Sequence, residues 1–528
     1  MSSEVNLTEV ERPASSNLAS LVILAIATLW CIYWFVHARG YWEDDAYIHL
    51  EFARSVAAGR GFAFNGHVVA GDTAPLWVFL LAAMHAIIPD WMSAGKALTV
   101  CGAIFGLAGI YAFARNLAAQ ILPTATLLPA AMVLLIVANP YSCYWLFSGM
   151  EPITAAGLAC FAVLAATRNQ PSTKSFLTAC LLAGIAPLLR PEMIFLTALL
   201  VLPLFAQFRR LPASPARLAI FAAGLILLCA PLGLWSVYSL HAFGHVLPNT
   251  NAAKRSGPGD SVVRRLASVY SLGFPVIAGG FIAGIAALVL RPAMIRRAIQ
   301  NALASTFARA SERSTSLPFA GWIFILWPLI AAVFYVLNHT YVQTRYILVS
   351  APGLSIVVLL LALQASRFAG RAVYVVALVA ALTVSVVTVR PFIRNKGISC
   401  QATQGFALFI RDHIPADAPV AAYAIGQIAF VSEHPIVDTG GITRPGAIPY
   451  LNSPPELLRW AHSQGAQYQI VDHQPEPGAT AVYSAYMPFI GWTFHTARYA
   501  SSAPTEIWKL APSPNASQQA NASPATRP

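Results

Sequence analysis

Long apolar segments separated by short polar loops make up most of the first 390 residues. They lack the alternation of polar and apolar residues that marks a barrel strand, so they are predicted to be membrane helices. The first of them, residues 18–36, is long enough to cross a bilayer, and no small-residue cleavage site follows it, so we interpret it as an uncleaved membrane helix. The apolar segments lie at residues 18–37, 74–88, 94–115, 121–138, 152–167, 176–189, 191–206, 217–240, 271–290, 318–336, 346–366 and 371–389.

The segment 74–88 differs from the others in length. A helix that crosses a bilayer needs about 20 apolar residues, and this segment stops at Pro89-Asp90 before it reaches that length. Helices that do not cross are tolerated at membrane depth when protein surrounds them. We therefore predict a half-helix packed at the outer leaflet and eleven crossings in total.

Basic residues indicate which side of the membrane each loop faces. The loop 291–317 is rich in arginine, and such loops face the cytoplasm. Counting from it places the N-terminus in the cytoplasm and the loops 139–151, 241–270 and 337–345 outside. The prediction is a multi-pass protein of the bacterial inner membrane with an extracytoplasmic C-terminal region.

The chain changes character after residue 390. Residues 391–510 are richer in polar residues, Gly and Pro, and they mix short β-type runs with helical patterns. We expect a transmembrane domain at 1–390, a small soluble α/β domain at 391–510, and a disordered low-complexity tail at 511–528. The expected strands are 420–424, 435–437, 468–471 and 506–510, and the expected helices are 404–412 and 455–463.

Composition agrees with an α-helical membrane protein. Hydrophobic residues make up 57% of the 528 residues and charged residues only 10%, against about 25% charged residues in soluble domains. The net charge of +12 comes from basic residues scattered between apolar segments. That distribution argues against nucleic-acid binding and for contact with membrane lipids. The sequence contains no phosphate-binding glycine loop, serine nucleophile elbow or cysteine pair with metal spacing.

Three consecutive acids, Glu43, Asp44 and Asp45, follow the first membrane helix. Acids at a membrane boundary are typical of sites that take a proton from a hydroxyl or hold a cation. Asp44 is expected at or near the N-cap of an amphipathic helix ended by the glycines at 59–61, and His49 falls one turn after Asp45. We predict that Asp44 and Asp45 are catalytic, and that Asp44, Asp45 and His49 are candidate ligands of a divalent cation. A solvated charge cluster and simple helix capping are the alternatives.

Two further acids adjoin predicted membrane helices. Glu151 directly precedes Pro152, and Glu192 follows Arg190-Pro191. An acid at a helix start can simply stabilise the helix dipole, and an Arg–Glu pair at membrane depth is commonly structural. The functional alternative is a second carboxylate that faces the two aspartates.

Basic residues also lie in loops that are predicted to face outwards. Lys254 follows Asn249, and Arg345 is next to Tyr346. Because outward-facing basic residues oppose the positive-inside trend, we interpret them as ligands for a lipid-linked phosphate. Contact with ordinary anionic headgroups is the alternative.

Several motifs together resemble the GT-C superfamily of membrane glycosyltransferases. The run DDAYIHLEFARSVAAGRGFAFNG, followed by GDTAPLWVFLL, is similar to the first outer loop of its mycobacterial-type terminal arabinofuranosyltransferase group. Gly71-Asp72-Thr73 departs from the more usual aromatic-containing form of this element, which leaves the sugar open. Supporting motifs lie at 148–152, 190–192, 248–250 with Lys254, 345–346, 426–430 and 436–441.

The resemblance implies a GT-C-like helical membrane enzyme that transfers a sugar, arabinofuranose or a related one, from a polyprenyl-phosphate donor. The acceptor would be a cell-envelope glycan or glycolipid outside the cytoplasm, with inversion and often with a divalent cation (Mg²⁺, Mn²⁺ or Ca²⁺). Asp44 or Asp45 would be the base. We expect Arg345, Lys254 and Arg190 at the donor phosphate. Around the acceptor we expect Glu151, His49, Glu192, Asn249 and Tyr346.

Two other functions fit a polytopic envelope protein: transport of a lipid-linked saccharide, and non-catalytic envelope assembly. Transporters commonly show repeats with broken helices in paired positions, and the sequence shows no such pairing.

Overall fold

The computed structural model describes residues 14–122, 126–213, 215–255, 317–340, 342–365, 371–487 and 504–511. Residues 256–316, which hold the predicted crossing 271–290 and nearly all of the arginine-rich loop, lie outside this set, as does the predicted tail from residue 512. The count of eleven crossings and the direction of each loop therefore stay predictions.

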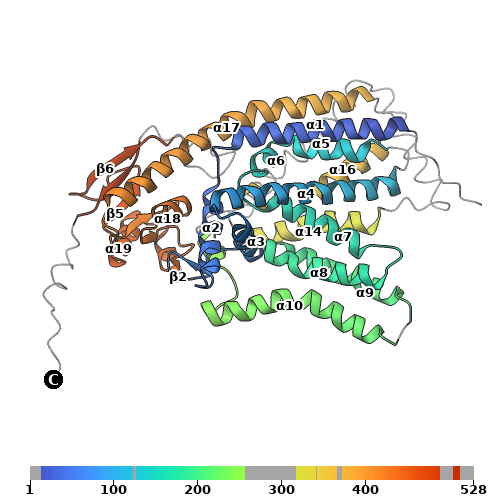
Figure 1. The fold of residues 1–528 in the computed structure, drawn as a ribbon, viewed down its shortest axis with the longest axis horizontal. Coiled ribbons are helices and arrows are strands. Elements are labelled where there is room, and N and C mark those ends of the chain that lie inside the picture. The colour runs from blue at the N-terminus through green and yellow to red at the C-terminus, as the bar shows by residue number, and fades with distance from the viewer. Residues whose placement is uncertain are drawn as a thin grey trace, which may run out of the picture.

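Roughly parallel helices form a bundle, and a smaller unit of strands and helices lies at one end of it (Figure 1). Shorter apolar helices pack among the long ones, namely α5 (Leu128–Val137), α7 (Pro152–Ala166), α8 (Thr173–Leu189) and α16 (Ala351–Ala365). Five described helices are long and apolar enough to cross a membrane: α1 (Ala14–Ala38), α4 (Trp91–Ile121), α9 (Met193–Arg210), α10 (Arg217–Phe243) and α14 (Phe319–Leu337).

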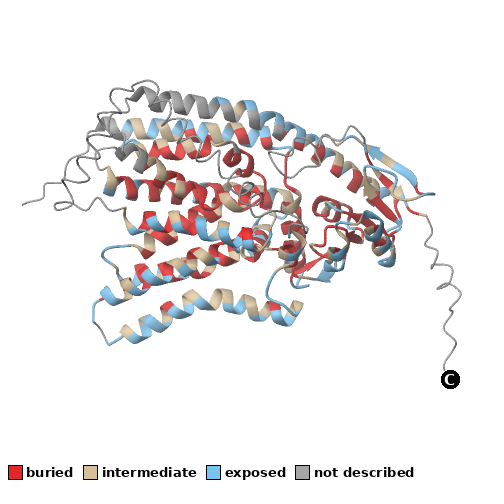
Figure 2. Ribbon diagram, turned by 180° about the vertical axis from the view of Figure 1, so that it is seen from behind, coloured by how far each residue is buried: buried red, intermediate tan, exposed pale blue. Residues whose placement is uncertain are grey.

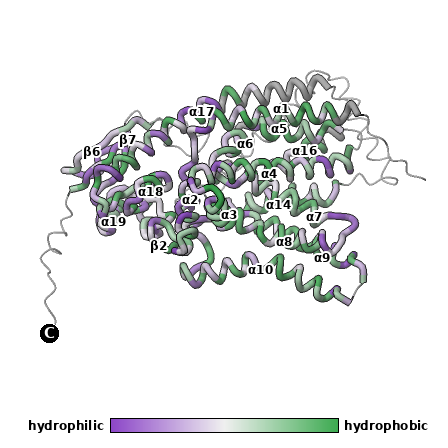
Figure 3. The backbone as a smooth tube through the Cα atoms, viewed as in Figure 1, coloured by the Kyte–Doolittle hydropathy of each residue, from purple (hydrophilic) through white to green (hydrophobic). Residues whose placement is uncertain are grey.

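The outer surface of the bundle is apolar. On α10, Leu218, Leu234 and Val237 are all well exposed, and Figures 2 and 3 show exposed, hydrophobic stretches along the bundle helices. A large exposed apolar surface is unfavourable in water, whereas lipid tails accept it. The protein is therefore an integral membrane protein.

Glycines allow α4 and α7 to pack closely. A Cβ atom built at Gly109 would lie 2.5 Å from the carbonyl oxygen of Gly157, and one at Gly106 would clash with the backbone of Ile153. Small residues are common at such helix contacts in membranes, because they let the two backbones approach. This contact fixes the N-terminal end of α7, and with it Glu151, relative to α4.

The segment 39–74, which is predicted to be the first outer loop and is given that name below, forms a compact unit at the end of the bundle. α2 (Asp44–Ala57) begins at the acidic motif and ends just before Gly59, which has a positive φ, so the predicted helix is confirmed. Asn65-Gly66 makes the tight turn of a hairpin between β1 (Ala63–Phe64) and β2 (His67–Val68), a dipeptide that suits this turn because both residues tolerate positive φ.

The predicted half-helix is α3 (Pro75–Ile87). Its 13 residues span about 20 Å at 1.5 Å per residue, less than the bilayer core of about 30 Å. The short length is confirmed. Its location at the outer leaflet stays a prediction.

The C-terminal unit holds a five-stranded mixed sheet in the order β4-β3-β5-β7-β6. β3 is parallel to β4 and β5, and β7 is antiparallel to β5 and β6. The four strands expected from the sequence correspond to β3, β4, β5 and β7, whereas β6 and the short helix α18 were not expected. The elements are β3 (Val420–Ala422), α18 (Gly426–Ser432), β4 (Ile436–Asp438), η1 (Pro445–Tyr450), α19 (Pro454–Ser463), β5 (Tyr468–Val471), β6 (Thr480–Ala485) and β7 (Thr505–Lys509).

One helix joins the bundle to the C-terminal unit. α17 (Arg371–His413) passes through the predicted boundary at residue 391 without a break and contains Pro391. It includes the expected helix 404–412. The buried apolar core also continues from the bundle into the sheet, with Phe406, Val420 and Ile507 in the same cluster as the bundle side chains. The two regions thus share one core.

Candidate active site

Asp45 lies among cations contributed by two other segments of the chain. Arg345, on α15 (Thr344–Leu348), donates a hydrogen bond from Nη2 to Asp45 Oδ2. Lys254, just after α11 (Asn249–Ala253), places its Nζ 3.8 Å from the same oxygen. Burial would raise the pKa of Asp45, but Arg345 and Lys254 outweigh it and hold the pKa below its usual value. Asp45 is therefore ionised and paired at neutral pH.

Three cations surround the ring of Tyr346. Lys254 Nζ lies 3.1 Å from its hydroxyl, and the charged groups of Arg190 and Arg345 lie 5.0 and 5.5 Å from its ring centre. Burial would raise the pKa of Tyr346, but the three cations together lower it. Arg345 is only 3% exposed, yet its Nε and Nη1 have no hydrogen-bond partner among the described residues. Asp45, Glu151 and Glu192 pair with these three cations, and Arg345 keeps donor groups available for an anion.

Glu151, Arg190 and Glu192 form a buried ion-pair group. Arg190 Nη1 lies 2.7 Å from Glu151 Oε1, and Arg190 Nη2 lies 2.7 Å from Glu192 Oε1. Both carboxylates thus engage Arg190, which was predicted to bind the donor phosphate. In the structure Arg190 contacts the Tyr346 ring, Glu151 and Glu192. Contact between Arg190 and the donor phosphate stays a prediction.

His49 extends this group towards α3. Its Nδ1 contacts Asp72, and its Nε2 lies 3.4 Å from Glu151 Oε2. Burial would lower the pKa of His49, but the two carboxylates outweigh it and raise the pKa to about 10. Burial would raise the pKa of Glu151, yet His49 and Arg190 bring it to about 2. Charges therefore alternate in sign from Asp72 to Arg190.

Asp72 is not among the site residues predicted from the sequence. Its Oδ1 accepts a hydrogen bond of 2.6 Å from the amide of Ala74 at the start of α3, while Oδ2 holds His49. An acid two residues before the start of a predicted apolar helix is a recognisable helix-start signal. The signal was present in the sequence, but its second contact depends on the fold.

Asp44 points away from the cations and caps a helix of the C-terminal unit. Its two carboxylate oxygens accept hydrogen bonds from the amides of Gly426 (3.0 Å) and Gln427 (2.9 Å) at the start of α18. Asp44 lies next to the N-cap of α2, as expected, since Glu43 is the N-cap. The alternative that Asp44 caps its own helix is not borne out, because its hydrogen bonds go to α18. Burial raises the pKa of Asp44 to about 7 in spite of the two amide bonds.

Glu43 anchors the start of α2 to neighbouring segments. Its carboxylate accepts a hydrogen bond of 2.6 Å from Tyr144 and a further one from Tyr41, and Lys396 of α17 lies 4.0 Å away. Tyr144 belongs to α6 (Pro140–Trp145). Glu43, the first acid of the motif, thus has a structural role.

The three predicted metal ligands diverge. Asp44 faces α18, Asp45 faces Arg345, and His49 lies between two other carboxylates. No group of three or more His, Cys, Asp or Glu side chains among the described residues is arranged to hold a metal ion. The three side chains do not converge on one point in this structure, and a divalent cation held by them stays a prediction.

Asn249 joins the site to the first loop. Its backbone N–H donates a hydrogen bond of 2.8 Å to the carbonyl oxygen of Ala70, and the residue is buried. This contact ties the start of α11, the helix that precedes Lys254, to the segment just before Asp72.

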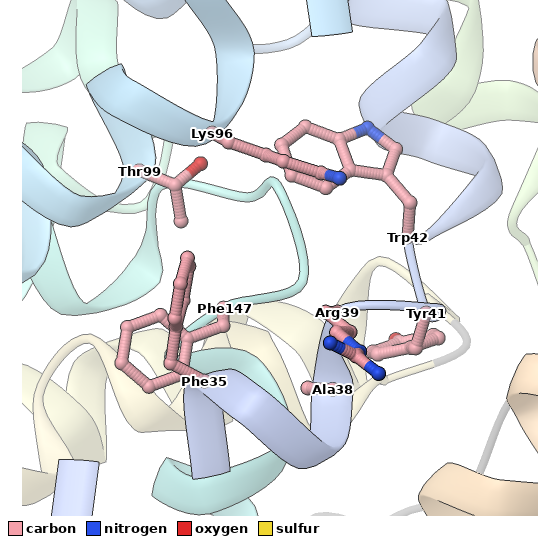
Figure 4. Close-up of a pocket in the computed structure, with 8 residues that line it drawn as sticks. All are labelled: Phe35, Ala38, Arg39, Tyr41, Trp42, Lys96, Thr99 and Phe147. Atoms are coloured by element: carbon pink, nitrogen blue, oxygen red, sulfur yellow. The ribbon is translucent and has the colours of Figure 1, made fainter. Parts of the chain in front are cut away.

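Two cavities adjoin this region. The smaller, about 50 Å³, lies beside Trp42 between α1 and α4, with Arg39 and Lys96 in its wall (Figure 4); it has room for a water or two, not a sugar. The larger, about 520 Å³, lies between the end of α2, α3, α8 and α10. Its lining is mainly apolar and includes Phe62, Phe79 and Trp235.

Similarity to known proteins agrees with this architecture. ArnT from Cupriavidus metallidurans in the apo state shares 14% sequence identity at a TM-score of 0.55, over 94% of this chain and 99% of that one. The same protein bound to undecaprenyl phosphate gives 14% identity and a TM-score of 0.52, over 95% and 99% of the two chains. These neighbours are GT-C glycosyltransferases. The chain has a GT-C-like fold.

Other similarities are more limited. The Archaeoglobus fulgidus oligosaccharyltransferase in the apo form matches at 12% identity and a TM-score of 0.44, over 86% of this chain and 69% of that one. Residues 393–516 match a protein family described as a domain of unknown function (DUF8728). No curated protein matches the chain at a significant level.

Proposed function

We propose that this protein transfers a sugar from a polyprenyl-phosphate donor to a hydroxyl group of a cell-envelope glycan or glycolipid. The observation that carries the proposal is the placement of Asp45 against Arg345 and Lys254, at the end of a bundle with the GT-C-like fold. The undecaprenyl phosphate bound by the structural neighbour ArnT supports a lipid phosphate as ligand. By the resemblance of the first loop, arabinofuranose or a related sugar is the first donor to test, while Gly71-Asp72-Thr73 leaves the sugar open.

Arg345 and Lys254 would bind the phosphate of the donor. As the sugar leaves, the electron pair of the bond between its anomeric carbon and oxygen stays with the phosphate, whose negative charge grows. Buried cations already directed at that position stabilise this charge more effectively than solvent does. The unpartnered Arg345 nitrogens suit a second phosphate oxygen.

Asp45 would act as the base. It is ionised in the absence of donor because its two cationic neighbours stabilise the charge. A bound phosphate competes for Arg345 and Lys254, and this competition raises the proton affinity of Asp45 when the acceptor is in place. The acceptor oxygen then bonds to the anomeric carbon from the face opposite the leaving phosphate, and its proton passes to Asp45. The configuration at the anomeric carbon inverts.

The larger cavity offers a location for the first part of the lipid tail. It borders α2 and is lined mainly by apolar and aromatic side chains, which suit an isoprenoid chain.

Donor consumption by the purified protein in lipid nanodiscs tests the proposal. We expect release of polyprenyl phosphate from polyprenyl-phosphate arabinofuranose or a related sugar donor when an envelope glycan acceptor is added. The Asp45→Asn variant should lose about 10²- to 10⁴-fold in rate, and Asp412→Asn, at an exposed position on α17, is the matched control. If the wild-type protein consumes no donor, the transporter or assembly function takes precedence. A parallel reaction with a chelator tests whether transfer needs the predicted divalent cation.

A further inference from the structure

The start of α18 has two backbone amides that need acceptors from outside the helix. The first N–H groups of any helix have no partner within it. At α18 the N-cap residue, Ile425, supplies no side-chain acceptor. Asp44 accepts from both Gly426 and Gln427. One side chain of the first outer loop thus performs the capping that a local Ser or Asp normally performs.

Gly426 lets the two backbones approach. A Cβ atom at this position would clash with the backbone carbonyl oxygen of Asp44, which cannot yield as a flexible side chain does. The glycine here is required by this contact, since the residue lies inside an ordinary helix and has no positive φ. This observation is independent of the hydrogen bonds and points to the same docking.

The docking of Asp44 on α18 is a second anchor for the first turn of α2, beside the bonds that Glu43 accepts from Tyr41 and Tyr144. The N-cap of α2, Glu43, makes no side-chain capping bond to the helix, so local bonding leaves the first turn weakly held. Adjacent residues of a helix point about 100° apart. With Asp44 directed at α18, Asp45 is directed at Arg345.

We propose that the C-terminal domain positions Asp45 by holding Asp44, so that Asp44 is a positioning residue and Asp45 alone takes the acceptor proton. The inference rests on the proposed function and deepens it. It gives the C-terminal unit a role in the same reaction. It also assigns different roles to two adjacent acids that the sequence does not distinguish.

Two substitutions at Asp44 separate positioning from proton transfer. Asn keeps one acceptor oxygen for α18 but cannot take a proton, whereas Ala does neither. We expect Asp44→Asn to keep kcat within about tenfold of wild type, because one of two hydrogen bonds remains. Asp44→Ala should lower kcat about 100-fold with the donor KM within about threefold, since a small misplacement of a catalytic group has an effect of that size.

Gly426→Ala disturbs the same contact from the other side while Asp44 stays intact. We expect it to reproduce the effect of Asp44→Ala on kcat. The matched controls are Gly397→Ala, where a Cβ would make only ordinary contact, and Glu456→Gln, an exposed charge on α19. Both should leave kcat unchanged. Hydrogen exchange at the Gln427 amide, followed by mass spectrometry, should accelerate in Asp44→Ala and Gly426→Ala only.

Each outcome decides the proposal. Equal loss of activity in Asp44→Asn and Asp44→Ala makes Asp44 the proton acceptor and overturns it. An active wild type with an unaffected Gly426→Ala variant overturns the positioning role and leaves the proposed function standing. A wild type that consumes no donor overturns both, and the exchange of Gln427 then still reports whether the two regions dock.

Discussion

Asp44 and Asp45 are the same residue type at adjacent positions, yet their surroundings shift their pKa values in opposite directions. Burial dominates at Asp44, whose carboxylate accepts hydrogen bonds from two backbone amides, and the pKa rises to about 7. Two cations dominate at Asp45. The sequence identified both acids as candidates, but their different roles depend on contacts with segments 200 to 400 residues away in the chain.

His49 should make stability depend on pH in the alkaline range. Its folded-state pKa is about 10 against an ordinary value of 6.5, so the folded protein holds the proton more tightly than the unfolded chain does. The stabilisation is fully present below about pH 6.5 and is lost as the pH rises through about 10. Melting temperatures from pH 6.5 to 10 should fall more steeply in the wild type than in His49→Gln. Parallel curves would show that Asp72 and Glu151 do not hold the protonated ring.

Arg345 should matter through its fork of donors as well as its charge. Arg345→Lys keeps a cation beside Asp45 but loses the planar group that can bind Asp45 and a phosphate oxygen together. We expect kcat/KM for the donor to fall about 10²- to 10³-fold, as for other groups that stabilise developing charge. Steady-state kinetics over a range of donor concentrations measure this. Arg411→Lys, at an exposed position, serves as control, and equal kinetics in both variants would remove Arg345 from the donor site.

At the scale of elements, local patterns were informative where one segment decides its own structure. The first-loop helix, the short helix α3 and four C-terminal strands follow from apolar periodicity, helix-ending glycines and β-branched runs. α18 was missed because its seven residues are too few for a helical period. Its start is capped by a residue that the sequence places far away.

The contact between α4 and α7 gives a prediction for packing. Gly109→Ala places a methyl group against the carbonyl oxygen of Gly157, and overpacking of this kind destabilises by about 1–3 kcal/mol. Gly233→Ala in α10 meets no atom within 4 Å and should be neutral or slightly stabilising, since Ala favours helix over Gly. Thermal unfolding in detergent compares the two variants. A Gly109→Ala variant as stable as wild type would mean that α4 and α7 can move apart without a cost in the free energy of unfolding.

At the scale of the molecule, the first outer loop and the C-terminal unit form one continuous surface around the site. Asn65 at the hairpin turn donates to the carbonyl oxygen of His434 (2.7 Å) and accepts from the amide of Ile436 (2.8 Å). Arg54 pairs with Glu433. The predicted division at residue 391 describes composition, whereas the apolar core and these contacts cross it.

Asn65→Gly tests this interface without backbone strain, because φ at residue 65 is positive. It removes both hydrogen bonds and should weaken docking by about 1–3 kcal/mol. Hydrogen exchange at the Ile436 amide should accelerate, and Asn65→Asp, which keeps the acceptor for that amide, should lie between wild type and Asn65→Gly. Unchanged exchange in Asn65→Gly would mean that the hairpin does not hold the sheet.

The sequence by itself determined that this is a helical membrane protein with an acidic first loop, a short third apolar helix and a C-terminal strand region, because hydropathy, length and turn residues act locally. Only the tertiary structure decided which acid meets cations and which caps α18, that His49 bridges Asp72 and Glu151, and that Arg190 is held by two carboxylates. These depend on where separate segments meet, and that placement is set by the packing of the whole bundle, which no single stretch of sequence contains.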